Sequence, residues 1–198
     1  MYKRILAAIN EFTNSEVAAR YAIALAKSCE AKLFLVFVAE DGIDRDASRD
    51  AESALGRLFI EAQNQGLEVE SITEKGSPLR NILAIVKKAP IDIVFTATRR
   101  EDISKRFFQR TLARDFMLRL SCSVAMVRVV QMGKSYPKQI LVPLKGGMTC
   151  LEERAYFVAK LAKVFDSSVT LFHLTSPITS FFHGEIHRRI RRGHGALR

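Results

Sequence analysis

The residues best suited to chemistry lie in one basic loop. Residues 91–97 are mostly β-branched and aromatic, which predicts a buried strand. Apolar residues recur every fourth position from Phe108 to Leu120, which predicts a helix. In an open α/β sheet, ligands bind where strand ends lead into helix N-termini, so the loop between is the predicted site for an anion or nucleotide. Seven residues of this loop have a hydroxyl or cationic side chain that could bind phosphate oxygens: Thr98, Arg99, Arg100, Lys105, Arg106, Arg110 and Thr111.

A simpler interpretation of this loop is a solvated helix face with basic side chains. Glu101 and Asp102 already balance part of its charge. We favour this interpretation. No nucleophile elbow, P-loop or pair of catalytic carboxylates accompanies the loop, so we predict that the protein is not an enzyme. His183 and His187 are four residues apart but do not form a zinc motif, so no metal site is predicted.

The composition of the chain limits which partners and which cellular compartment are expected. The formal charge of +10 is concentrated in residues 99–119 and 188–198, but no recognition helix, zinc finger or RNA-binding aromatic motif accompanies it, so nucleic-acid binding is not favoured. No apolar run reaches the roughly 20 residues that span a bilayer, and no signal peptide precedes the first strand. The cysteines are scattered and odd in number, which favours a reducing cytoplasm. They are Cys29, Cys122 and Cys150.

Strands and helices alternate through the first 130 residues. Strands are predicted at residues 2–10, 32–39, 67–73, 91–97 and 123–130, with a helix in each interval. This alternation requires parallel pairing with right-handed crossovers, so residues 1–130 are predicted to form a doubly wound α/β domain. The third strand is more polar than the others and is predicted to lie at an edge.

Local signals predict where the helices begin and end. Residues 13–16 have the spacing of a capping box for the first helix. Residues 40–50 are acidic and are predicted to form a loop before the second helix, which Gly66 ends. Ser77 and Pro78 are predicted as the N-cap and first residue of the third helix.

The remainder of the chain partly repeats its beginning. After a linker at 131–137, residues 138–145 echo residues 3–10, residues 158–163 echo 22–27, and residues 168–174 echo 32–38. We therefore predict a partial βαβ unit over residues 138–177, followed by a basic, disordered tail at 178–198. A lone βαβ unit cannot cover both faces of its strands, so it must dock on something or remain loose.

Several of these features together resemble the universal stress protein (UspA) family. They are the polar loop after the first strand, the Gly76-Ser77-Pro78 start of the third helix, the sequence IDIV at 91–94, and the last strand SCSVAMV at 121–127. The resemblance covers residues 2–130, and residues 136–176 resemble the first half of a second such domain, as in tandem members. It implies a sheet of order 3-2-1-4-5 and dimerisation, often through the last strand.

The resemblance also implies two functional branches, one of which binds ATP. After strand four, that branch has the pattern Gly-x-x-Gly, followed after nine intervening residues by Gly and then Ser or Thr. It also has an Asp at the end of strand one. In this chain the glycine positions carry Ala97, Arg100 and Arg110, only Thr111 matches, and the Asp position carries Asn10. Glycines let backbone amides approach phosphate without a Cβ in the way, whereas arginine side chains would crowd that space.

These comparisons predict a cytoplasmic stress-response protein that acts by forming a homodimer and binding unidentified protein partners, without a cofactor. The alternative is an ATP-binding member with slow hydrolysis or ligand-gated signalling. Under that alternative the site residues are Asn10, Thr98, Arg99, Arg100, Arg110 and Thr111.

Overall fold

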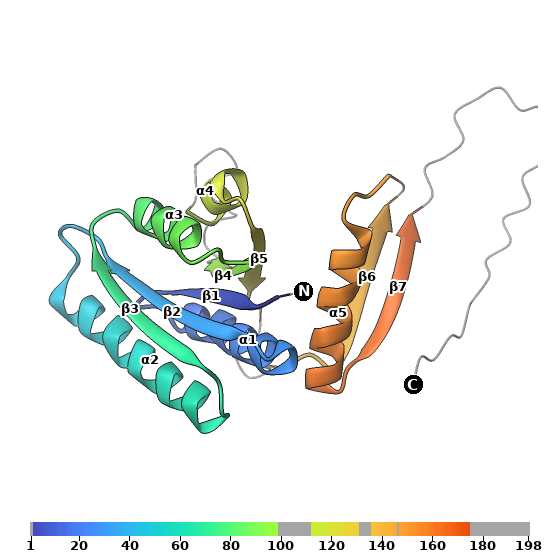
Figure 1. Cartoon of the computed structure of the whole chain (residues 1–198), viewed down its shortest axis with the longest axis horizontal. Coiled ribbons are helices and arrows are strands. Elements are labelled where there is room, and N and C mark those ends of the chain that lie inside the picture. Colours follow the sequence, from blue (N-terminus) through green and yellow to red (C-terminus); the bar gives the residue numbers. More distant parts are fainter. Residues whose placement is uncertain (1, 99–111, 131–135, 146, 175–198) are drawn as a thin grey trace, which may run out of the picture.

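A five-stranded parallel sheet forms the first part of the molecule (Figure 1). The computed structural model describes residues 2–98, 112–130, 136–145 and 147–174. The strand order is β3-β2-β1-β4-β5, as predicted. The strands are β1 (Arg4–Ile9), β2 (Lys32–Ala39), β3 (Val69–Lys75), β4 (Ile93–Thr98) and β5 (Ser123–Arg128). The doubly wound α/β fold is therefore confirmed.

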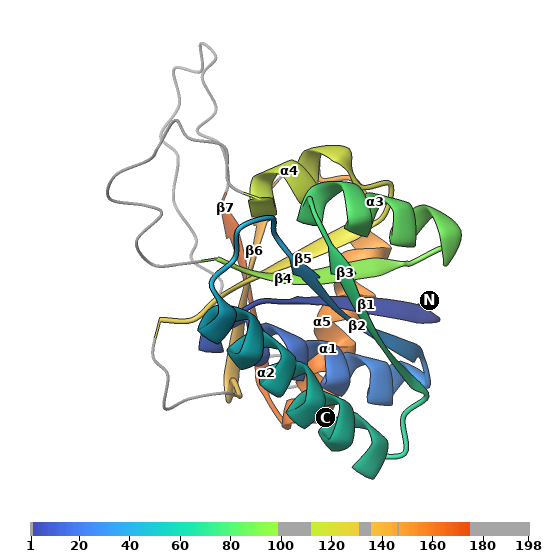
Figure 2. The same cartoon turned by 90° about the vertical axis from the view of Figure 1, so that its left-hand side faces the viewer.

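Helices cover both faces of this sheet (Figure 2). On one face lie α1 (Thr13–Cys29) and α2 (Arg45–Asn64), and on the other α3 (Pro78–Lys88) and α4 (Leu112–Arg119). Alternating residues of each strand supply the two cores, because successive side chains of a strand point to opposite faces. Leu33 and Leu35 of β2 pack beneath α1 and α2, whereas Phe34 packs against the α3 side.

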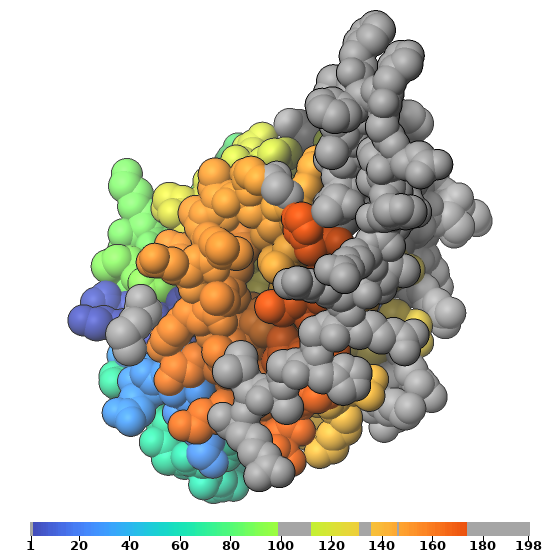
Figure 3. Space-filling model, turned by 90° about the vertical axis from the view of Figure 1, so that its right-hand side faces the viewer, coloured from blue at the N-terminus to red at the C-terminus, as the bar shows by residue number. Residues whose placement is uncertain are grey.

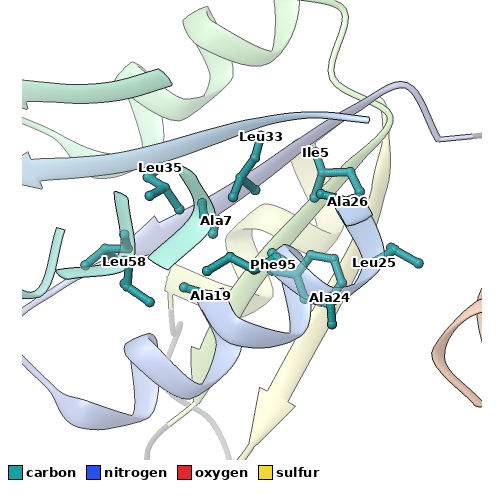
Figure 4. Close-up of a cluster of buried hydrophobic side chains, with 14 of the residues drawn as sticks. Ile5, Ala7, Ala19, Ala24, Leu25, Ala26, Leu33, Leu35, Leu58 and Phe95 are labelled. Carbon is teal, nitrogen blue, oxygen red and sulfur yellow. The ribbon is translucent and has the colours of Figure 1, made fainter. Parts of the chain in front are cut away.

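The α1 side of the sheet is packed through small residues. Ala19, Ala22 and Ala26 of α1 are fully buried against the strands, and Ala7 of β1 is buried opposite them (Figure 4). Small side chains let the helix backbone approach the sheet closely, and the ring of Phe95 fills the space beside them. β2 lies inside the sheet, and its apolar run is buried on both faces, which is typical of a covered parallel strand.

Two helix starts differ from the predictions. The acidic stretch is not wholly a loop, because α2 already begins at Arg45. The Asp44 carboxylate accepts a hydrogen bond from the backbone amide of Asp46 at 3.1 Å. Acidic side chains at this end of a helix stabilise it, because its first backbone amides are unpaired and carry partial positive charge. The capping box at α1 is also wrong: the N-cap is Phe12, and no side-chain cap bond forms there. The predicted cap at Ser77, with Pro78 as the first residue of α3, is confirmed in position.

A single carboxylate joins the amino ends of β1 and β4. Asp92 Oδ2 accepts hydrogen bonds from the backbone amides of Lys3 at 2.6 Å and Arg4 at 2.8 Å. Because removing the carboxylate leaves two amides without this acceptor, Asp92→Ala should lower the free energy of unfolding by about 1–3 kcal/mol. Chemical denaturation followed by far-UV circular dichroism measures this. Asp50→Ala, at an exposed position beyond the first turn of α2, is the control and should change the free energy by less than about 0.5 kcal/mol.

A partial second βαβ unit follows. It consists of β6 (Gln139–Lys145), α5 (Leu151–Phe165) and β7 (Ser168–Leu174), and its two strands pair in parallel as a separate two-stranded sheet. Within β6, Ile140, Val142 and Leu144 are half-buried, and the alternating residues are exposed. The predicted tail at 178–198 and most of the predicted linker lie outside the described residues.

The second unit docks on the first through α5. Leu161 and Phe165 of α5 are buried within the same apolar cluster as α1 and the α1 face of the sheet. The Phe165 ring lies 5.2 Å from the ring of Tyr21 in α1, and the Phe157 ring lies 6.2 Å from that of Phe95 in β4. Of the two predicted outcomes, docked or loose, the described residues therefore show the docked one.

Polar contacts and a further aromatic residue extend this interface. The Lys160 ammonium donates a hydrogen bond to the backbone carbonyl of Ser28 at 2.8 Å, which places a cation at the C-terminal end of α1. The Cys29 thiol and the Tyr156 hydroxyl are 3.6 Å apart. Tyr2 packs its ring against both Tyr156 and Phe157, at 5.7 and 6.4 Å. The interface thus combines a buried apolar centre with hydrogen bonds around it.

Candidate functional site

The predicted site lies at the carboxyl edge of the five-stranded sheet, where the strand order reverses. β1 pairs with β2 on one side and with β4 on the other, so the chain leaves β1 and β4 in opposite directions across the sheet. Ligands of open α/β proteins bind at such a switch point. In the observed register Ala7 pairs with Phe95, which places Asn10 and Thr98 at the neighbouring ends of the two strands. The structure thus brings these two predicted residues to one edge.

The side chain of Asn10 is committed to its own loop. Its Oδ1 accepts a hydrogen bond from the backbone amide of Phe12 at 3.1 Å, which forms an Asx turn. The backbone amide of Asn10 donates to the hydroxyl of buried Ser15 at 3.1 Å. That hydroxyl lies 2.8 Å from the backbone carbonyl of Phe12 and 3.0 Å from that of Asn10, so either can accept its proton. These bonds fix the entry into α1. The bond from Phe12 also takes one of the two lone pairs of the Asn10 side-chain oxygen.

Of the other predicted site residues, the structure describes only Thr98. Thr98 is the half-buried last residue of β4, while Arg99, Arg100, Arg110 and Thr111 lie outside the described residues. Sequence reasoning missed Ser15 as the residue that orders the β1–α1 loop. Its place, five residues after Asn10 at the start of a helix, is the available signal, because Ser and Asn form such local side-chain-to-backbone bonds.

The described part of the edge has mixed charge. Glu11 follows Asn10, and Glu40 and Asp41 follow β2, whereas Lys75 and Arg128 end the outer strands β3 and β5. Carboxylates beside the switch point disfavour a phosphate unless cations are closer to it. The described residues therefore do not form a concentrated positive site. Any such site depends on the arginines of the loop after Thr98.

An open pocket of about 390 Å³ lies near the opposite edge, beside the docked unit. Asp92, Cys122 and Ser123 line it from the first unit, and Glu153 lines it from α5. Burial raises the pKa of the Cys122 thiol, and the Asp92 carboxylate acts in the same direction. The thiol is therefore mainly protonated near neutral pH and is a poor nucleophile. The Asp92 carboxylate already accepts two backbone hydrogen bonds, so its role in this pocket is structural.

Tyr2 lies at the junction of the two units. Burial, followed by the nearby Glu153 carboxylate, raises the pKa of its hydroxyl to about 12. The phenol is therefore neutral at physiological pH and contributes mainly its ring, which packs on α5. Among the residues that the structure describes, no three His, Cys, Asp or Glu side chains come together as a metal site.

Sequence reasoning did not identify α5 as an interface helix. The signal is present when the two copies are aligned, because Arg20 and Cys29 of α1 correspond to Tyr156 and Phe165 of α5. An aromatic residue that replaces a polar or small one on a helix needs apolar surroundings. Both aromatic residues lie against the first unit.

The fold and the switch point define an open α/β protein whose ligand edge lies between β1 and β4. The universal stress protein family model matches residues 1–128 of the 198-residue chain, and the chain belongs to this family. No curated protein sequence matches the chain. Within the described ranges, none of the helices combines the length and apolar character that crossing a bilayer requires.

Solved structures share this fold. The universal stress protein UspA from Lactobacillus plantarum is 16% identical, with a TM-score of 0.56 over 64% of this chain and 98% of that chain. A universal stress protein in complex with cAMP is 15% identical, with a TM-score of 0.51 over 64% of this chain and 97% of that chain. A protein of unknown function from Pseudomonas aeruginosa PAO1 is 16% identical, with a TM-score of 0.61, and the match covers 86% of this chain and 60% of that chain. At these identities the likeness concerns the fold alone.

Proposed function

We propose that this universal stress protein acts in the cytoplasm by dimerisation and partner binding, without catalysis and without ATP. The observation that carries the proposal is Asn10 at the switch point: it lacks the carboxylate of the ATP-binding pattern, and its Oδ1 is held in the loop by a hydrogen bond from the Phe12 amide. Arginines at two of the glycine positions of the ATP-binding pattern support it further, because their side chains would crowd the triphosphate.

We further propose that the chain is a tandem type with an incomplete second domain. The support is the repeated order of strand, helix and strand and the similar pairing of the two units. Ile5 pairs with Leu33 in the first unit, and Ile140 pairs with Val169 in the second, so the separations are 33 − 5 = 28 and 169 − 140 = 29 residues. On this proposal residues 1–130 and 138–177 are the two domains.

A nucleotide-binding role is the second candidate. It is favoured by the position of Asn10 and Thr98 at the switch point. It is also favoured by a universal stress protein of the same fold whose structure was solved in complex with cAMP. Under this proposal the guanidinium groups of the loop would hold the phosphate by side-chain hydrogen bonds, which arginine can form in pairs. The β1–α1 loop would hold the base.

ATP should not stabilise the purified protein. At a concentration 100 times its Kd, a bound ligand adds about 2.7 kcal/mol of stability, which would raise Tm by roughly 5 °C or more for a chain of this size. We expect a shift of less than about 1 °C with 5 mM Mg-ATP in differential scanning fluorimetry, and no released adenine absorbance after heat denaturation of the protein.

Two controls separate a nucleotide site from attraction of a polyanion to a basic chain. Inorganic triphosphate should match ATP if only charge matters, and its effect should fall as salt rises. Asn10→Ala tests the switch point directly. A stoichiometric nucleotide, or an ATP-specific shift that Asn10→Ala removes, would refute the proposal and establish the nucleotide-binding candidate.

A further inference from the structure

The outer strand of the second unit is exposed and apolar. Every residue from 168 to 173 of β7 is exposed, including Leu171 at 65% and Phe172 at 51%. In Figure 1, β7 is the labelled element farthest from the five-stranded sheet, and Figure 3 views the molecule from that side. Parallel strands are normally covered on both faces, and an exposed apolar edge strand is a surface on which another strand can pair.

The backbone groups of β7 alternate between a paired side and an open side. Its Ser168 amide donates to the Lys138 carbonyl next to β6 at 3.0 Å, so the amides of Val169, Leu171 and His173 point away from β6. The equivalent strand of the first unit shows how these outward amides are paired in a complete sheet. There, the Leu33 amide of β2, equivalent to that of Val169, donates at 2.8 Å to the Glu68 carbonyl that precedes β3. Among the described residues no strand occupies this place beside β7.

The edges at β6 and β3 are less suited to pairing. In β6 the open side includes Pro143, which has no amide hydrogen to donate, and prolines are found at such unpaired edges. The outer strand β3 carries Glu70, Glu74 and Lys75, and charged side chains discourage strand addition. β7 has the sequence SVTLFHL and carries no charge while its histidine is neutral.

We infer that β7 pairs antiparallel with β7 of a second copy of this chain, which forms a continuous four-stranded sheet of order β6-β7-β7-β6. This inference deepens the proposed dimerisation and rests on it. When the same strand of two copies pairs about a two-fold axis, the outward amides of each strand face the outward carbonyls of the other. The interface is therefore self-complementary. Two chains of charge +10 meet there through uncharged strands, which avoids like charges opposite each other.

A lysine in β7 should break this dimer. Leu171 is the middle residue of the seven-residue strand, so two copies of Leu171→Lys would bring ammonium groups close to the two-fold axis. We expect the dimer dissociation constant, from sedimentation velocity over a concentration series, to rise by about tenfold or more. Leu141→Lys is the matched control, because Leu141 is equally exposed at 65% but lies in β6. It should change the constant by less than about threefold.

Hydrogen exchange of the full-length wild-type chain tests the inference without a substitution. The amides of Val169, Leu171 and His173 should gain protection as the protein concentration rises, while the outward amide of Leu141 should not. Protection of these amides in the monomer would mean that another segment or partner covers the edge, and would overturn the inference.

The outcomes separate this inference from the proposed function. A dimer that survives Leu171→Lys but is lost in Met126→Lys, at an exposed residue of the edge strand β5, would overturn the β7 interface and keep dimerisation. A chain that stays monomeric at every concentration would overturn both.

Discussion

Phe165→Ala should release the second unit from the first. The Phe165 side chain is only 8% exposed, and its ring lies 5.2 Å from that of Tyr21 and 5.1 Å from that of Tyr136. Truncating a buried phenylalanine costs about 3–5 kcal/mol, from lost burial and the cavity that remains. Part of that free energy holds α5 on α1, through the contact with Tyr21. We therefore expect amides of β6 and β7 to lose protection in hydrogen exchange before those of the first sheet.

Val164→Ala provides the control for this substitution. Val164 is the preceding residue of α5 and is exposed, and alanine favours a helix more than valine does. Its exchange pattern should match that of the wild type. If Phe165→Ala left the protection of β6 and β7 unchanged, the second unit would not depend on this contact. If it reduced protection uniformly over the whole chain, the two units would unfold as one.

The strands were predictable because their local signals and their tertiary roles agree. The run from Lys32 to Ala39 is almost continuously apolar, and it forms the buried strand β2 with the predicted bounds. The polar alternation of the third strand predicted an edge, and β3 lies at one. Alternation of strands and helices then restricts the topology to few possibilities. The sheet order came from the family resemblance, and the structure agrees with it.

The start of α2 was less predictable because composition alone was used. Acidic residues suggested a loop, yet the same residues stabilise a helix when they lie in its first turn, as Asp46 does behind Asp44. The docking of α5 depends on residues more than 100 positions apart, such as Tyr2 and Tyr156, and no local pattern records such a pairing. The aromatic residues at 156 and 165 are the available signal, and sequence reasoning did not use them.

The candidate site stays a prediction. The rule for strand ends predicts it beside Asn10 and Thr98, and the structure brings these two strand ends together. It could not reveal that the Asn10 carboxamide closes an Asx turn, because this depends on the backbone path from Asn10 to Ser15. The arginines of the loop remain a prediction from sequence.

Phe95→Ala should have the largest effect on the first unit. Phe95 is 1% exposed and lies in β4, in the apolar cluster that α1, α2 and α5 share. The loss should be about 3–5 kcal/mol in the free energy of unfolding, because the sheet and α1 cannot collapse into the space of a whole ring. Chemical denaturation followed by far-UV circular dichroism measures it. Ile60→Ala, at a residue of α2 that is 59% exposed, should cost less than about 0.5 kcal/mol.

A double-mutant cycle with Phe157→Ala then tests whether this core is shared between the units. The two rings are 6.2 Å apart although they belong to different units, so the substitutions should not be additive. We expect an interaction energy between about 0.5 and 1.5 kcal/mol, the range found for aromatic pairs. An energy of zero within error would mean that Phe157 does not pack on the first unit in solution. The single substitution would still report on the core of the sheet, since Phe95 is also enclosed by residues of α1.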